Sequence, residues 1–469
     1  MTPDANDLCV FAIKRGKIKT RYDVQNALYA LSETYKAVQK VPLGDLVKEE
    51  PCYGTSATAV DRTSEDQPKY IRITDFDDFG IDENHTFMTA ETYAENHLLE
   101  SGDVLFARTG GTVGKTYYYD GSIGKAVFAG YCIRFRFDEK KVLSKFVYWC
   151  TKTVSYAAWV KGIQRPSGQP NINKEEYKSF EISVPSLKTQ EIMSGKMDLV
   201  NNKRRRIIND ANTIIQGIYK LVLERLGLSF ENTTKYSSYA IVYKDICERT
   251  DADFYCPQFV KFRRQIDESS FSTVTIDAIS NSIITGFAAG KQDQADDLPE
   301  EDRVPHLRPF SITVEGELSF ETKKFVPKAN LKPEDYCVKH EILFNNTNSP
   351  ELVGKTTVFD SDVLCAASNH MTRITVKDGV NPYYVAAFFN VLLSIGYWKL
   401  LCTNFNNQAG VNTETLKKVK IPLPPKEIQD QIANEIMQRR AQANELRKQA
   451  VKEWADAKAQ FEKELLGEG

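Results

Sequence analysis

The feature that most constrains this chain is an internal repeat whose period is close to half of its 469 residues. Residues 102–106 (GDVLF) return as 340–344 (HEILF), and residues 113–116 (VGKT) return unchanged as 353–356. The offset between matched anchors stays between 238 and 240 along the chain. Chance matches would scatter, so the sequence predicts two copies of one unit.

Both copies follow the same internal order. Short runs such as 70–73 (YIRI), 104–106 (VLF) and 133–137 (IRFRF) are rich in β-branched and aromatic residues, which favours strands. Asn381 followed by Pro382 is typical of a helix start. A proline-punctuated strand follows in each copy, at 181–185 and 419–425, and then a long helical pattern.

The two final helical stretches carry apolar residues at alternating steps of four and three, which is the a and d spacing of a coiled coil. A helix over 189–226 would be about 55 Å long at about 1.5 Å per residue. Such a helix outruns its own globular domain, so we expect the two helices to pair with each other. The alternative is that each packs separately on its own domain. The predicted seam contains Met193, Met197, Val200, Ile207, Ile214, Ile218, Leu221, Ile432, Ile436, Leu446, Trp454 and Phe461.

The expected fold class is therefore α/β (α+β), with two similar domains separated by two long antiparallel coiled-coil helices in a pseudo-two-fold repeat. The predicted boundaries are an N-terminal segment at 1–40, a first domain at 41–185, a first long helix at 186–228, a second domain at 229–425 and a second long helix at 426–469. Two similar units on a rod form a caliper, which suits contacts to two unlike stretches of duplex about one to two helical turns apart.

Composition excludes several classes of protein. The chain is 42% hydrophobic and 26% charged, and no apolar run is long enough for a membrane span. Nine cysteines without a C-x-x-C spacing, and no secretory signal at the start, predict reduced thiols and a cytoplasmic location. The net charge of −2 argues against a non-specific DNA coater but allows a specific reader with one positive face.

Residues 102–115 (GDVLFARTGGTVGK) resemble the motif that recurs in the specificity subunits of type I restriction-modification systems. Residues 168–173 (GQPNIN) and 345–355 (NNTNSPELVGK) resemble that family as well, as does the order of proline-rich strand, glutamine and long helix. The resemblance covers the chain from about Lys40 onward. It implies two target-recognition domains, each followed by a helix that docks a methyltransferase subunit.

The resemblance further implies a non-catalytic chain that binds a bipartite, asymmetric site in double-stranded DNA. Its implied partners are two methyltransferase subunits and the endonuclease/translocase subunits, with no membrane. S-adenosylmethionine, ATP and magnesium are then bound by the partners and not by this chain. Two alternatives stay open: a fused enzyme with its own restriction or methylation centre, and a coiled-coil interaction protein that does not bind DNA.

Base readout is expected where the copies differ, at 53–96 and 286–325, whereas the shared loops suit phosphates or structure. One shared motif also differs, because Asn346 stands where the first copy has Arg108. The candidate DNA-contacting residues are Arg72, Arg108, Lys115, Arg165, Gln169, Arg308, Lys323, Lys324, Lys355 and Gln408.

Two short segments resemble enzyme motifs, but each lacks a residue that its motif requires. Residues 110–116 (GGTVGKT) resemble a P-loop, but Thr109 replaces its first glycine and a strand-like run follows where a helix is needed. Residues 381–384 (NPYY) lack the second proline of the methyltransferase N-P-P-Y loop, and a helix start explains them. No histidine or cysteine spacing indicates a metal site, so no catalytic or metal-ligating residue is predicted.

Overall fold

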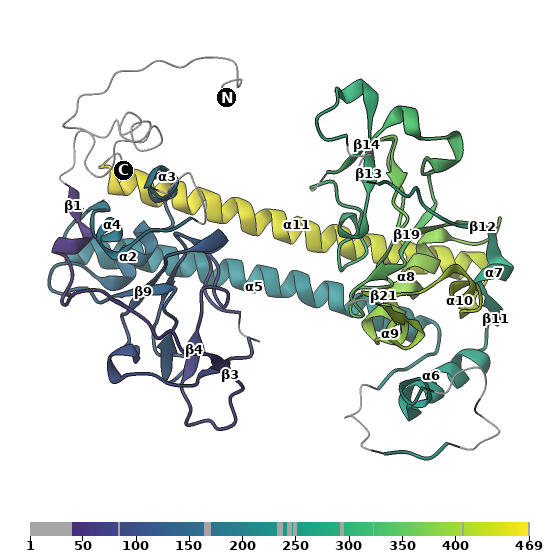
Figure 1. Ribbon diagram of the computed structural model, residues 1–469, viewed down its shortest axis with the longest axis horizontal. Coiled ribbons are helices and arrows are strands. Elements are labelled where there is room, and N and C mark those ends of the chain that lie inside the picture. Colours follow the sequence, from purple (N-terminus) through teal and green to yellow (C-terminus); the bar gives the residue numbers. More distant parts are fainter. Residues whose placement is uncertain are drawn as a thin grey trace. The chain divides into compact units, whose positions relative to one another are not determined.

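The computed structural model describes residues 40–82, 85–163, 170–231, 238–241, 246, 251–290, 295–321, 323–405 and 408–467. The chain divides into two compact units: the first comprises residues 1–207 and 448–469, and the second residues 208–447. Helices α5 (Leu187–Arg225) and α11 (Lys426–Leu465) each contribute one end to either unit (Figure 1). The remainder of each unit is a mixed α/β domain, which confirms the predicted fold class.

The domain of the first unit is built on a four-stranded antiparallel sheet in the order β2-β9-β6-β7. Its strands are β2 (Cys52–Tyr53), β9 (Cys132–Phe135), β6 (Val104–Ala107) and β7 (Thr116–Tyr118). Strand pairs accompany it: β4 (Lys69–Ile71) with β8 (Ala126–Phe128) in parallel, and β3 (Ala59–Val60) with β5 (Thr89–Ala90) and β1 (Lys40–Pro42) with β10 (Glu181–Ser183) antiparallel. The short helices are α2 (Ser144–Cys150), α3 (Val154–Ile163) and α4 (Lys174–Lys178).

The domain of the second unit repeats this plan with the sheet order β12-β19-β15-β17. These strands are β12 (Ser280–Thr285), β19 (Met371–Val376), β15 (Ile342–Asn345) and β17 (Thr356–Val358). The other strands are β14 (Phe325–Pro327), β13 (Arg303–Leu307) and β18 (Ala366–Ala367) in one sheet, β16 (Thr347–Asn348), β21 (Gln408–Gly410) and β20 (Thr403–Phe405) in another, and the pair β11 (Ser272–Thr275) and β22 (Lys420–Leu423). The helices are α6 (Pro257–Asp267), α7 (Ile276–Ile279), α8 (Pro382–Ser394), α9 (Tyr397–Leu401) and α10 (Thr413–Lys417).

The two domains share their main sheet and two further strand pairs. The parallel pair β4–β8 matches β13–β18, and the closing pair β1–β10 matches β11–β22. The central strands β6 and β15 are buried along their whole length, which explains why they read as unbroken apolar runs and not as alternating patterns. At α8, Asn381 caps the helix through the backbone N–H groups of Tyr383 and Tyr384, with Pro382 in the first turn, as the sequence predicts.

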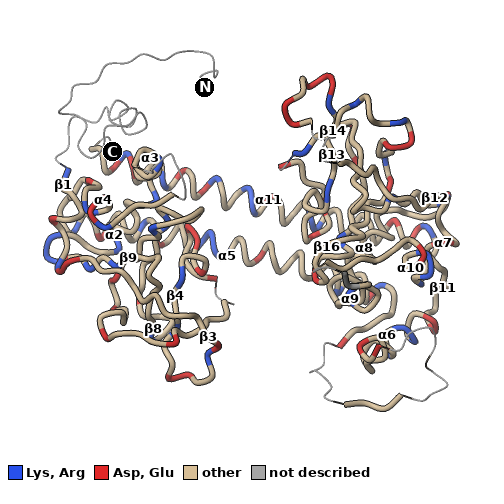
Figure 2. The backbone as a smooth tube through the Cα atoms, viewed as in Figure 1, with Lys and Arg blue, Asp and Glu red and all other residues tan. Residues whose placement is uncertain are grey.

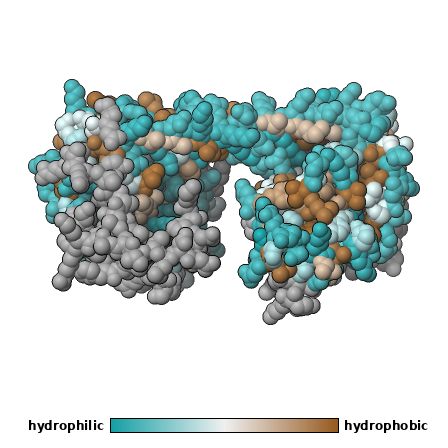
Figure 3. Space-filling model, turned by 90° about the horizontal axis from the view of Figure 1, so that it is seen from above, coloured by the Kyte–Doolittle hydropathy of each residue, from teal (hydrophilic) through white to brown (hydrophobic). Residues whose placement is uncertain are grey.

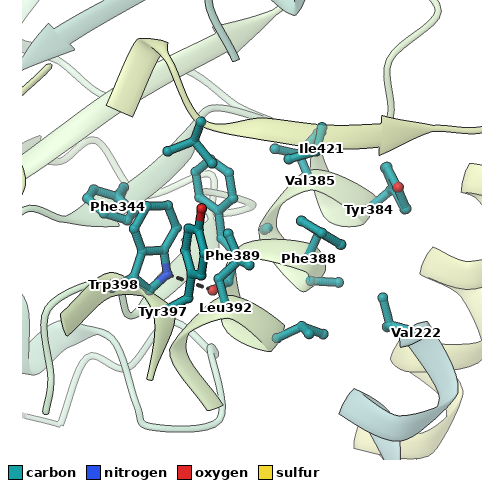
Figure 4. Packing of buried hydrophobic residues seen from close by; sticks show 14 of the residues in the cluster. Val222, Phe344, Tyr384, Val385, Phe388, Phe389, Leu392, Tyr397, Trp398 and Ile421 are labelled. Atoms are coloured by element: carbon teal, nitrogen blue, oxygen red, sulfur yellow. Dashed lines mark hydrogen bonds between the residues drawn. The ribbon is translucent and has the colours of Figure 1, made fainter. Parts of the chain in front are cut away.

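Aromatic rings fill the core between the central strand and the helices of the second unit. Trp398 meets Phe344 and Phe389 edge-on, at centroid distances of 4.8 and 5.1 Å, and its Nε1 donates to the Phe389 carbonyl at 2.8 Å (Figure 4). Gly354 has φ +98°, and a Cβ there would lie 2.1 Å from the Trp398 ring. Gly114 is the counterpart in the first unit, pressed against Val160 with φ +88°. The glycine of the repeated VGKT motif is therefore required for packing and for its backbone conformation.

The two long helices run antiparallel to each other where they meet. In the first unit Lys196 pairs with Glu464 and Lys203 with Glu453, each at 2.8 Å, so one index rises as the other falls. In the second unit Arg225 pairs with Glu435 at 2.9 Å. Figure 1 shows α11 (yellow) beside α5 (teal) in both units. The predicted antiparallel pairing is confirmed.

The predicted seam is buried, and it also joins the domain cores. Its nearly inaccessible members are Met193, Met197, Ile207, Ile218, Leu221, Ile432, Ile436, Trp454 and Phe461, while Val200, Ile214 and Leu446 are partly buried. Met193 and Trp454 belong to the same cluster as the β6 residue Phe106. Arg204, which interrupts the apolar pattern, places its guanidinium carbon 3.1 Å from the ring centroid of Phe79. The seam therefore serves both pairing of the helices and packing on the domains. Within the described ranges, no helix is long and apolar enough to cross a bilayer.

Candidate nucleic-acid interface

The repeated motif keeps the same backbone hydrogen bonds in both units. Ala107 donates its N–H to the Lys115 carbonyl at 2.8 Å, as Asn345 does to Lys355 at 2.9 Å. Arg108 donates its backbone N–H to the Tyr131 carbonyl at 2.9 Å. In the second unit, the equivalent bond runs from Asn346 to His370 at 3.0 Å. Arg108 and Asn346 thus occupy equivalent positions, as do Tyr131 and His370.

Arg108 lies half-buried beside two tyrosines of the first unit. Its guanidinium carbon stands 4.7 Å from the ring centroid of Tyr53, a cation–π arrangement. Tyr53 and Tyr131 are 37% and 63% exposed, so both rings are open to a partner. Among the described residues, the buried Nε of Arg108 finds no hydrogen-bond acceptor.

Asn346 is placed very differently, although its backbone matches. It is buried, and its Nδ2 donates to the Asn369 carbonyl at 3.2 Å and to Thr372 Oγ1 at 3.0 Å. Its Oδ1 accepts from Thr347 at 2.8 Å. Asn346 is thus committed to the interior of its domain, so a contact assigned to Arg108 does not transfer to the second unit.

The two motif lysines diverge in the same way. Lys355 is 6% exposed and donates its Nζ to the carbonyls of Pro309 and Ile312 at 2.8 and 2.6 Å, and burial lowers its pKa. This placement argues against a DNA contact of Lys355, because its ammonium group is buried and already donates to two backbone carbonyls. Lys115 is only half-buried, and its side chain remains the better candidate of the two.

Arg72 and Arg308 also prove to be equivalent, one residue beyond the matched parallel strands β4 and β13. Arg72 donates its backbone N–H to Asp75 Oδ2 at 2.9 Å, and Arg308 donates its own to Ser311 Oγ at 3.1 Å. The Arg72 guanidinium is held by the buried Asp75 carboxylate through Nη2–Oδ1 and Nε–Oδ2 contacts of 2.9 and 3.1 Å. One third of the Arg72 side chain stays exposed.

The remaining candidates are scattered. Lys323 is exposed, and Lys324 pairs with Asp296 at 2.7 Å. Gln408 is exposed on β21. Arg165 and Gln169 lie outside the described residues. The structure gathers no single cluster from the candidates that it describes, and the position of Arg108 differs from the others by its contact with Tyr53.

In the views of Figures 2 and 3, neither charge nor hydropathy sets one part of the described surface apart. Lys and Arg are interspersed with Asp and Glu over the described parts of both units (Figure 2). Seen from above, the surface is mainly hydrophilic, with hydrophobic patches on the second unit (Figure 3). Its exposed hydrophobic residues include Phe310, Val314, Val338, Val363 and Leu364. Across the described part of the chain, no His, Cys, Asp or Glu cluster is arranged to hold a metal ion.

The family model described as "Type I restriction modification DNA specificity domain" matches residues 35–215 and 299–453. Over 110 residues, the chain is 31% identical to a putative type I restriction enzyme MjaX specificity subunit from Methanocaldococcus jannaschii. That alignment spans 22% of this chain and 26% of the archaeal protein, so about a quarter of that relative is matched.

Two solved structures are similar as well. One, described as concerning complex assembly and conformational transition of the type I R-M system, has a TM-score of 0.51 at 14% identity. It covers 92% of this chain and 100% of its own, and it supports the fold. The other is the type I restriction-modification S subunit from M. genitalium, with a TM-score of 0.43, 10% identity and coverages of 92% and 97%.

Proposed function

Because this chain belongs to the type I restriction-modification DNA specificity family, we propose that it recognises a bipartite, asymmetric DNA sequence. The observation that carries this proposal is the pair of matched domains with unmatched side chains. Arg108 and Asn346 stand on the same backbone frame but differ in charge, size and exposure. Two domains that share a backbone arrangement but carry different side chains suit two half-sites of different DNA sequence.

The proposed division of labour follows the repeat. Residues 41–185 and 229–425 are the target-recognition domains, and residues 186–228 and 426–469 are the helices that hold them. The ion pairs and buried seam between α5 and α11 support the role of the helices as a common frame. The chain itself would read DNA and leave catalysis to partners.

The proposed partners are methyltransferase subunits docked on this frame and, with them, endonuclease/translocase subunits. S-adenosylmethionine, ATP and magnesium would then be bound by those partners. Neither alternative raised from the sequence, a fused enzyme or a coiled-coil protein without DNA, is favoured by an observation on the described residues.

Selection from a random pool of double-stranded DNA tests the proposal. The full chain, together with any subunit that co-purifies with it, should enrich duplexes with two short conserved blocks separated by a fixed, unconserved gap. Mapping of methylated bases in host DNA should return the same two blocks, and they should vanish when the gene is deleted. Enrichment of a single block, a palindrome or no motif at all would contradict the proposal.

A further inference from the structure

The first unit has a half-buried arginine, Arg108, where the second unit has the buried Asn346. Four backbone hydrogen bonds align the two positions, so the difference lies in the side chains and not in the frame. The side-chain amide of Asn346 forms hydrogen bonds with Asn369, Thr372 and Thr347. Arg108 has no such interior partners among the described residues, and its guanidinium instead lies over Tyr53.

The Tyr53 ring lies against that guanidinium, 4.7 Å from its carbon to the ring centroid. Tyr53 is itself held, because its strand pairs with β9 and its hydroxyl accepts from the Lys174 backbone N–H at 3.3 Å. A guanidinium stacked on an aromatic ring loses little conformational freedom when it binds, since its planar fork is already oriented. The contact with Tyr53 therefore restricts the Arg108 side chain before an acceptor binds.

Among the described residues, the surroundings of Arg108 leave room for such an acceptor. Tyr131, whose carbonyl accepts from the Arg108 backbone, is 63% exposed. Gly111, three residues after Arg108, is exposed, and a Cβ there would meet nothing within 4 Å. Two exposed tyrosines, an oriented arginine and a bare glycine together form a surface that a rigid ligand can approach closely.

We propose that Arg108, oriented by Tyr53 and flanked by Tyr131, reads a guanine edge in the half-site bound by the first unit. The guanidinium fork matches the O6 and N7 acceptors of guanine in the major groove. Because the same fork can also bind a phosphate bidentately, the experiment is designed to separate the two contacts. The second unit has no counterpart, because Asn346 is buried. This inference rests on the proposed function and assigns one position of one half-site.

The test compares duplex selection by the wild-type chain with that by Arg108→Asn, which installs the residue of the second unit. Wild type should require guanine at one position of one block. R108N should lose that requirement and bind the selected duplex roughly 10- to 100-fold more weakly, with the other block unchanged. Arg206→Asn removes the same charge from an exposed site on α5 and should leave both blocks intact.

Two further variants separate base reading from a phosphate contact and from misfolding. Arg108→Lys keeps the charge but loses the planar fork, so it should retain non-specific affinity and weaken the guanine preference. Tyr53→Phe keeps the ring and should select as wild type, while Tyr53→Leu should weaken the same single position. These conservative variants decide the matter even if R108N fails to fold.

Three outcomes would overturn the inference. One is selection by R108N that is unchanged at every position. Another is that a variant of Arg108 loses affinity equally for all sequences, and that the slope of log binding constant against log salt concentration falls in magnitude by about one. That result would identify a phosphate contact. The third is a wild-type chain that enriches no duplex. That result differs from the other two because it is seen with the wild-type chain, and it would contradict the proposed function itself.

Discussion

Arg447 of α11 forms a bidentate ion pair with Glu315, with Nη2–Oε1 at 2.6 Å and Nη1–Oε2 at 2.7 Å. Arg440 adds a bond from its Nη2 to the Glu315 carbonyl at 2.6 Å, just before Gly316 with φ +76°. The first unit repeats the device, since Arg205 of α5 donates to the Phe79 carbonyl at 2.7 Å beside Gly80, whose φ is +112°. Each recognition domain is thus tied by a loop to the helix that follows it.

Removal of this tie should weaken the second unit. Arg447→Met keeps an unbranched apolar stem but leaves the partly buried Glu315 carboxylate without the two N–H donors of Arg447, which should cost about 1–3 kcal/mol of unfolding free energy. Urea denaturation followed by circular dichroism measures the cost. Lys448→Met, at an exposed neighbouring site, is the control and should change stability by less than about 0.5 kcal/mol. Equal midpoints for the two variants would refute the assigned role.

The ion pair between Glu341 and Arg373 is fully buried in the second domain. Their Nε–Oε2 and Nη2–Oε1 distances are 2.9 and 3.0 Å, and both side chains are less than 5% exposed. Arg373→Met strands a carboxylate in the interior and should cost about 3–5 kcal/mol. The double variant E341M/R373M should be less destabilised than R373M alone, because it leaves no unpaired charge. A double variant as unstable as the sum of the single variants would show that the two groups act independently.

Trp454 of α11 joins the helix pair to the first domain. Its ring lies 5.7 Å from Phe79 and 5.8 Å from Trp149, centroid to centroid, and it is 6% exposed. Trp454→Ala should cost about 3–5 kcal/mol through the cavity that it leaves. Val451→Ala on the same helix removes an exposed side chain and should be nearly neutral. Comparable losses for both variants would mean that the Trp454 face is not packed in solution.

Local patterns in the sequence were sufficient for the elements but not for the site. The two long helices, the cap at Asn381 and the repeated strands depend on neighbours a few residues away, and these predictions were confirmed. Lys115 and Lys355 share one motif, yet only Lys355 meets the carbonyls of Pro309 and Ile312, which are more than forty residues away in sequence. No local pattern encodes that difference.

The equivalence of Arg72 and Arg308 was missed for a related reason. Their separation of 236 residues departs from the 238–240 offset of the shared motifs, because the segments between the motifs differ in length. The registers of β4 against β8 and of β13 against β18 show that the two arginines occupy equivalent positions in the two domains. A search for pairs at a slightly variable offset within the two variable regions would have found them.

His306 on β13 takes the place that Tyr70 has on β4, and it is 3% exposed. Burial, with the charge of Arg308 nearby, lowers the pKa of His306 to about 4, from an ordinary value of 6.5. The unfolded chain therefore binds a proton between these two pH values when the folded chain does not. Folding stability supplied by the neutral imidazole is complete above the unfolded pKa and is lost as the pH falls from 6.5 towards about 4.

The substitution His306→Tyr, which copies the first unit, removes this titration. Wild type should lose about 2 kcal/mol more unfolding free energy than H306Y between about pH 7.5 and about pH 5, on the order expected for a shift of this size. Urea unfolding of both proteins at the two pH values measures the difference, and all other titrating groups cancel in the comparison. A parallel pH dependence for the two proteins would mean that His306 reaches a hydrogen-bonding partner or solvent in the folded chain and keeps an ordinary pKa.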